Sequence, residues 1–255
     1  MDKFLSVNSI NELKIFSMEH ILALAIIIIV CILIFICRQR LKKEKENKTF
    51  RYIWVCFSIL PLVSFQAWTI GVSTWSLNYS LPLQLCDMAL ILSAVMMINK
   101  NNNVFEVVYI WGMGGAFQAL LTPDLFYSFP HFMFFKFFIA HGIVIVVISF
   151  MVFVEGCRPQ PGALKRVFMF TNAYALAIAA FNIFTRSNYL FLCQKPNMPS
   201  IFDLMGPWPW YLLSLEVVLI ASFFLYNLPF YVYSRLLLSG EAVMNTTPEV
   251  GSNRP

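Results

Sequence analysis

Apolar residues follow one another along this chain in seven long runs, and short polar connectors separate the runs. An α-helix needs roughly 20 apolar residues to cross the hydrocarbon core of a bilayer, and each run is close to that length. The pattern therefore predicts seven membrane-spanning helices, over residues 18–37, 52–75, 81–98, 104–121, 132–154, 167–185 and 210–233.

The composition supports this interpretation. Of the 255 residues, 59% are hydrophobic and only 12% are charged, and the mean hydropathy is +0.72. Soluble domains carry about a quarter charged residues, so the chain is expected to be an integral membrane protein. We expect an all-α, polytopic membrane helical bundle in one domain over residues 18–238. A short segment, 1–17, precedes it and a polar tail, 239–255, follows it, which leaves no room for a separate soluble catalytic module.

The distribution of lysine and arginine predicts how the bundle is oriented. With seven spans, thirteen of these residues fall on one side and four on the other, and Lys136 lies inside a span. Loops rich in positive charge stay in the cytoplasm, so the N-terminus is expected outside and the C-terminus in the cytoplasm of a cell membrane. The formal charge of +5 comes largely from one loop, residues 38–51, beside a span. Topology and anionic lipids explain it better than nucleic acid does.

The cysteines do not predict a metal site or a disulfide framework. None of the six has a CxxC partner or the spacing of a metal-ligand set, and five lie in or beside apolar runs. No metal and no cofactor are therefore expected.

Polar side chains inside the expected spans gather in one half of the membrane. Ionisable groups are costly in hydrocarbon and usually face a bundle interior or a water-filled space, so they mark candidate sites. Counting ~1.5 Å per residue, most of them fall in the outer half and only Glu106 and Asn172 toward the cytoplasm. A single polar cavity opening to the outer leaflet would explain this. Its expected members include Glu19, His20, Gln84, Cys86, Asp87, Gln118, Lys136, His141, Asn182 and Glu216.

Cys86 and His141 come from different spans at comparable depth and could form a nucleophile and its base. A thiol becomes nucleophilic when an imidazole within hydrogen-bond reach takes its proton. Asp87, Gln118 or Asn182 would then orient the imidazole or donate to an oxyanion. Simpler roles stay open: a membrane cysteine is most often a packing residue, and an intramembrane histidine can serve an interhelical hydrogen bond.

For four other residues the sequence predicts only a general position or a need for a partner. His131 and His20 are interfacial residues that could contact a headgroup. Lys136 is expected to extend its ammonium outward to the interface. Glu216 needs a partner, for which Arg186 and Lys136 are the candidates.

Several sequence blocks resemble a known family: LQLCDMAL, WGMGGAFQALLTPD, FPHFMFFKFFIAHG, and NYLFLCQKP with DLMGPWPWYLLSLE. From about Leu81 to Pro229 the chain resembles the YwaF-like bacterial integral membrane proteins, which are similar to the eukaryotic transmembrane-protein-164 family. That resemblance implies an acyltransferase that moves a fatty acyl chain from a phospholipid to a lysophospholipid. It implies Cys86 as the acyl acceptor and His141 as the base.

Three functions are carried forward. The first is an acyltransferase working through a Cys86 thioester with His141 as base, its partners being a membrane phospholipid or lysolipid. The second is a non-enzymatic lipid- or solute-binding protein or a transporter with the same polar cavity, although no internal repeat of the transporter type is visible. The third is a structural or assembly role. The sequence indicates neither the donor, the acceptor nor the oligomeric state.

Overall fold

The computed structural model describes residues 4–195 and 201–246, and this part of the chain is helical, with no strand. The α-helices are α1 (Met18–Ile36), α2 (Arg38–Leu41), α3 (Glu44–Gly71), α4 (Leu85–Asn99), α5 (Asn102–Trp111), α6 (Phe117–Leu121), α7 (Phe132–Phe153), α8 (Ala163–Thr185) and α9 (Trp210–Thr246). Helices α5 and α6 are joined by a π-helical turn, Gly112–Ala116, and the three form one continuous span. Two short 3₁₀ turns, Tyr189–Phe191 and Ile201–Met205, lie between α8 and α9.

Six helical segments in the described residues are long and apolar enough to cross a membrane: α1, α3, α5 to α6, α7, α8 and α9. The remaining expected span, 81–98, corresponds to α4, which is apolar but has only 15 residues. At 1.5 Å per residue α4 is about 22 Å long, less than the ~30 Å hydrocarbon core. The beginning of α4 differs from the prediction because residues 81–84 are not helical and precede the helix.

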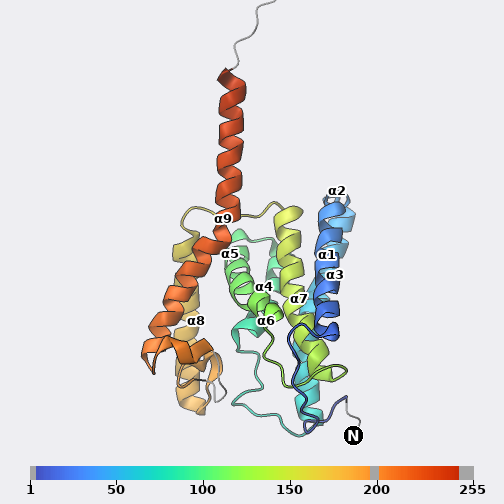
Figure 1. The fold of residues 1–255 in the computed structure, drawn as a ribbon, viewed down its shortest axis with the longest axis vertical. Coiled ribbons are helices and arrows are strands. Elements are labelled where there is room, and N and C mark those ends of the chain that lie inside the picture. Colours follow the sequence, from blue (N-terminus) through green and yellow to red (C-terminus); the bar gives the residue numbers. More distant parts are fainter. Residues whose placement is uncertain (1–3, 196–200, 247–255) are drawn as a thin grey trace, which may run out of the picture.

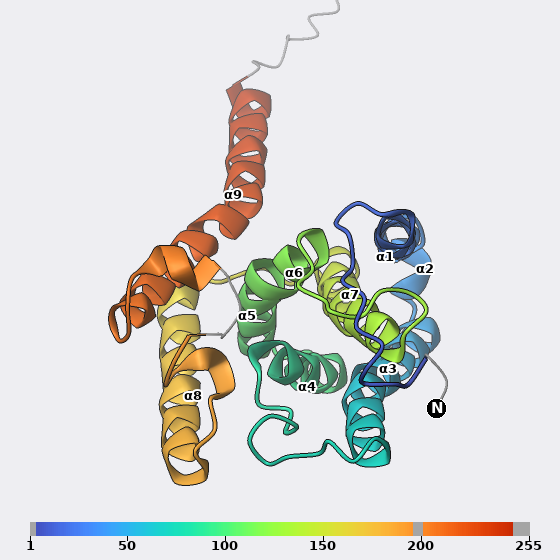
Figure 2. The same cartoon turned by 60° about the horizontal axis from the view of Figure 1, so that its bottom comes forward.

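Helix α7 lies at the centre of the arrangement. It packs against α1, α3, α4 and the α5–α6 span, while α8 and α9 pack on the other side of α5 (Figures 1 and 2). The sequence explains this position because α7 is apolar around nearly its whole circumference. Its residues Val147, Phe150 and Met151 are fully buried, whereas α1 and residues 210–232 of α9 keep most of their apolar side chains exposed. The outer helices therefore present apolar surface, as lipid contact requires.

A glycine allows the α5–α6 span to approach α7 closely, as the small residues of this span predict. A Cβ atom built on Gly112 would overlap Ile148 Cδ1 and would lie 2.8 Å from Val144 Cγ1. Gly115, three residues further in the same π-helical turn, has nothing within 4 Å of its built Cβ.

We expect Gly112→Ala to destabilise the protein by about 1–3 kcal/mol, because the methyl group overpacks the contact with α7. Gly115→Ala should be neutral or stabilising by up to ~1 kcal/mol, since alanine favours helix and the site is open. Thermal unfolding of both variants in one detergent measures the two effects. Equal shifts in the two variants would contradict this account of the contact.

The ends of the described chain differ in their packing. The N-terminal segment lies along the connector that precedes α7, with Asn11 N donating to Phe126 O and Leu13 N to Leu125 O, both at 3.0 Å. Helix α9 continues to Thr246 and so passes the expected boundary at residue 238; its C-terminal part projects away from the other helices (Figure 1). Residues 247–255 of the expected tail lie outside the described residues.

Candidate functional site

Cys86 lies in the first turn of α4. Gln84 is the N-cap residue, but its side chain does not cap the helix. Instead, Gln84 Oε1 accepts a hydrogen bond from Leu190 N at 3.2 Å. The first amide groups of a helix have no intrahelical acceptor, so the amides of Leu85, Cys86 and Asp87 point out of the helix end. A half-buried thiol thus lies beside unused backbone donors.

The irregular segment before α4 is held in place by two tyrosines from outside it. Tyr174 of α8 donates to Leu83 O at 2.8 Å. The Tyr189 hydroxyl donates to Leu77 O at 2.9 Å and accepts from Leu81 N at 3.0 Å. The two tyrosines thus bond backbone groups that would otherwise form the hydrogen bonds of a further helical turn before α4. This explains why the helix begins only at Leu85.

Asp87, the neighbour of Cys86, pairs with Lys136 of α7. Lys136 Nζ lies 3.6 Å from Asp87 Oδ1, and each side chain is only 16% exposed. The ammonium also lies 4.8 Å from the centroid of the Phe65 ring, a cation–π contact. The expected outward extension of Lys136 is therefore wrong: a carboxylate and an aromatic ring hold it between α3, α4 and α7.

His141 lies in α7, is 9% exposed and packs on Phe137 with ring centroids 4.3 Å apart. Its Nδ1 lies 2.8 Å from Phe137 O. A carbonyl only accepts hydrogen bonds, so Nδ1 carries the proton. In the neutral ring Nε2 then has a free lone pair, which is the protonation state that a general base needs.

The helix that carries Cys86, α4, packs against the helix that carries His141, α7. Both residues lie within electrostatic reach of the Lys136 ammonium, which acts on the Cys86 thiol and on the His141 imidazole. Lys136 is a residue whose role the sequence interpretation missed. Its position five residues before His141 in a span was the available signal.

Asn182 and Gln118, the other candidates for orienting the imidazole, have local partners. Asn182 is 1% exposed; its amide donates to Tyr189 O and accepts from Tyr189 N, both at 2.9 Å. It also accepts from Ser187 Oγ at 2.8 Å, so it shapes the turn that carries Tyr189. Gln118 is exposed and donates to Thr122 Oγ1 at 2.9 Å. Asn182 therefore supports the site from outside through Tyr189.

Glu216 finds its partner in Asn172, not in Arg186 or Lys136. Asn172 Nδ2 donates to Glu216 Oε2 at 3.2 Å. The depth estimate had placed these two residues in opposite halves of the membrane, and it is wrong for this pair. Counting residues assumes straight, parallel helices, whereas α8 and α9 are inclined to each other (Figure 2).

His131 is the N-cap residue of α7. Its Nδ1 accepts from Met133 N at 3.1 Å, and its Nε2 lies 3.3 Å from Ser6 O. Nδ1 must therefore be unprotonated and Nε2 must donate. Burial lowers the pKa of His131, against the opposing effect of the Ser6 hydrogen bond, so the neutral ring needed for capping is favoured.

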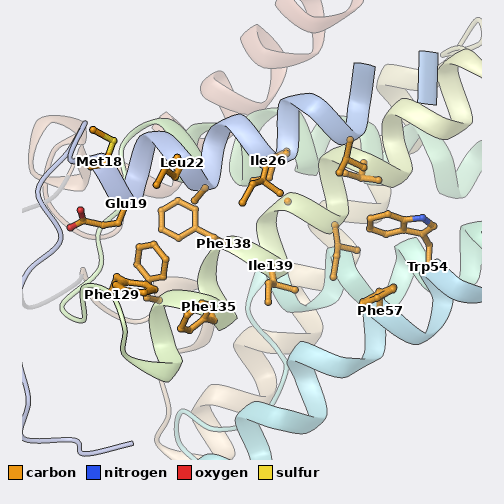
Figure 3. A pocket seen from close by; sticks show the side chains of 17 residues that line it. Met18, Glu19, Leu22, Ile26, Trp54, Phe57, Phe129, Phe135, Phe138 and Ile139 are labelled. Carbon is orange, nitrogen blue, oxygen red and sulfur yellow. The ribbon is translucent and has the colours of Figure 1, made fainter. Parts of the chain in front are cut away.

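An apolar cavity of about 610 Å³ lies between α1, α3 and α7. Figure 3 shows Phe129, Phe135 and Phe138 near one end and Trp54 and Phe57 near the other. Glu19 is the one charged residue among those lining it, and neither Cys86 nor His141 belongs to its lining. The cavity is separate from the thiol and the imidazole, although Gly142, the residue after His141, faces it.

The described residues contain no group of three or more histidine, cysteine or acidic side chains placed to hold a metal ion. The Lys136 ammonium is partly buried and lies within electrostatic reach of both the Cys86 thiol and the His141 imidazole, and the first amides of α4 lie beside the thiol. Such a set can perform acyl transfer through a covalent thioester.

Comparison with known proteins relates most of the chain to one family. The model of the TMEM164 family matches residues 15–227, which include all the helices from α1 through α8 and the first half of α9. No curated protein and no solved structure matches the chain significantly.

Proposed function

The chain belongs to the TMEM164 family and is a multi-pass membrane protein, and on that premise we propose that it is an acyltransferase. It would move a fatty acyl chain from a membrane phospholipid to a lysolipid or another lipid-linked hydroxyl in the cell membrane. The observation that carries the proposal is the hydrogen bond from His141 to Phe137 O: it leaves Nε2 as a proton acceptor on α7, which packs against α4, the helix that carries Cys86.

The reaction has two symmetrical halves. The Cys86 sulfur attacks the ester carbonyl of the donor while His141 Nε2 takes the thiol proton, and a tetrahedral oxyanion forms. When it collapses, the carbon–oxygen ester bond breaks and His141 returns the proton to the departing lysolipid oxygen. The hydroxyl of the acceptor then gives its proton to His141 and attacks the thioester carbonyl; the carbon–sulfur bond breaks, and His141 returns the proton to the departing sulfur, which restores the Cys86 thiol.

Three features near Cys86 favour the negatively charged species of this pathway. The positive end of the α4 dipole and the Lys136 ammonium both stabilise negative charge on sulfur or on the oxyanion. The unused amides of Cys86 and Asp87 are potential oxyanion donors. Burial disfavours a free thiolate, so proton transfer to His141 should accompany the attack of the sulfur.

Asp87 has an indirect role in this scheme. Its carboxylate Oδ1 lies 3.6 Å from Lys136 Nζ and so fixes the position of the ammonium, and Tyr174 and Tyr189 lie within the electrostatic reach of Asp87. Asp87 is a positioning residue, as are Gln84 and Asn182, which both bond the turn that contains Tyr189 and Leu190.

The test is whether Cys86 becomes acylated. Purified protein incubated with phospholipid should carry one acyl group on the Cys86 peptide, detected by mass spectrometry and released by neutral hydroxylamine, as a thioester is. Cys86→Ala should abolish the adduct completely because no other group replaces the sulfur. Cys56→Ala, which removes an exposed cysteine of α3, is the matched control and should leave the adduct unchanged.

A folded protein that never acylates at Cys86 would refute the enzyme proposal. Retained lipid binding or lipid exchange in that case would favour the alternative, a lipid- or solute-binding membrane protein or a transporter. Glu216 and Gln118 would then be the polar residues to test, since the covalent mechanism assigns them no step.

A further inference from the structure

A second, polar hollow lies at the opposite end of the bundle from Cys86. Its volume is about 410 Å³, and it is bounded by the start of α3, the end of α4 and the residues that follow α7. Lys100, in its wall, follows the C-terminus of α4, whereas Cys86 lies near the N-terminus. The separation of 14 positions between them corresponds to about 21 Å along the helix axis. The hollow is thus independent of the proposed acyl-transfer site.

The floor of the hollow is fixed by hydrogen bonds within the protein. The Arg51 guanidinium donates to Met97 O and Ile98 O at the end of α4. Asn47, which is 7% exposed, donates to Leu41 O at 3.1 Å and to Glu155 Oε1 at 2.6 Å. A ligand would therefore meet groups that are already ordered, which lowers the entropic cost of binding.

The charge of the hollow is positive. Four basic residues line it, Lys42, Lys48, Arg51 and Lys100, against two acidic ones, Glu44 and Glu155. The two acidic groups partly offset this charge, since Lys100 Nζ pairs with Glu155 Oε1 at 3.0 Å.

Two of the cations are available to a ligand. Within the described residues neither Lys42 nor Lys48 forms an ion pair, and both are exposed at the rim. Tyr52 also lines the hollow, and its hydroxyl is a further potential donor. This combination of several donors with excess positive charge matches a phosphate group, whose oxygens accept several charge-assisted hydrogen bonds.

The membrane topology explains why basic residues occur in the stretch 38–51, but it does not explain why several of them line one hollow. The positive-inside rule counts charges near a span and does not require them to share a hollow. Lys43 and Lys45 belong to the same basic stretch, residues 38–51, and do not line the hollow, whereas Lys42 and Lys48 do. We propose that this hollow is a binding site for a phosphate group, carried by an anionic lipid headgroup or by a small soluble ligand.

The proposal can be tested with two double variants of equal charge change. The full-length protein, Lys42→Gln/Lys48→Gln and the control Lys43→Gln/Lys45→Gln are placed in phosphatidylcholine nanodiscs at constant ionic strength. In one arm phosphatidic acid is titrated into the discs, and in the other inorganic phosphate is added. Binding is followed as the rise in thermal unfolding midpoint, which reports ligand bound to the folded state.

We expect the Lys42/Lys48 variant to bind about tenfold more weakly or worse, and the Lys43/Lys45 variant to stay within about twofold of the unmodified protein. Stabilisation by phosphatidic acid alone identifies a lipid headgroup as the source, and stabilisation by inorganic phosphate identifies a soluble ligand; either supports the site. Equal weakening in the two variants, or no stabilisation in either arm, would overturn it. The acylation of Cys86 is measured separately, so its failure would leave this result unaffected.

Discussion

Acyl transfer should fall by at least about 100-fold in His141→Asn, because the variant loses the proton acceptor while keeping the local structure. General-base catalysis contributes ~10²–10⁴-fold. The asparagine amide can occupy the place of Nδ1 and donate to Phe137 O, so the only group removed is the one at Nε2. The measurement is the rate of transfer of a labelled acyl chain from phospholipid to lysolipid by protein in defined vesicles.

The same substitution at His131 provides the comparison. Asparagine is among the best N-cap residues, so His131→Asn should preserve the start of α7 and keep activity within about twofold. If His141→Asn transferred acyl chains at the unmodified rate, His141 would not be the base. Its bond to Phe137 O would then be a packing feature of α7, and the binding or transport alternative would gain support.

The second large effect is expected at Glu106. This carboxylate is completely buried in α5 and accepts from Arg166 Nε and Nη2, both at 2.8 Å, from Gln160 N at 2.9 Å and from Asn102 Nδ2 at 3.2 Å. Arg166→Met should cost about 3 kcal/mol of unfolding free energy, since it leaves a buried charge without its counter-ion. Denaturation in mild detergent measures the loss.

Two further variants separate the ion pair from a general charge effect. Lys165→Met removes a positive charge from the neighbouring, exposed position of α8 and should change stability by less than about 0.5 kcal/mol. The double variant Glu106→Met/Arg166→Met removes both charges and should recover most of the lost stability. If the double variant were no more stable than Arg166→Met, the loss would come from packing and not from the unpaired carboxylate.

The sequence by itself determined where the membrane helices lie. Long apolar runs have no stable place except hydrocarbon or a buried core, so the predicted 132–154 became α7, Phe132–Phe153, and 18–37 became α1, Met18–Ile36, almost without change. The same reasoning identified Cys86 and His141 as candidates, because a polar residue inside an apolar run can be recognised from the sequence alone.

Only the tertiary structure decided which polar groups meet. The Lys136 ammonium lies between the helices because Asp87 and Phe65, from two other helices, compensate its charge more completely than the membrane interface would. Glu216 met Asn172 because α8 and α9 are inclined, and α4 began late because Tyr174 and Tyr189 hold the segment before it. Each outcome depends on contacts between residues far apart in the chain, and hydropathy, which is summed along the chain, contains no information about them.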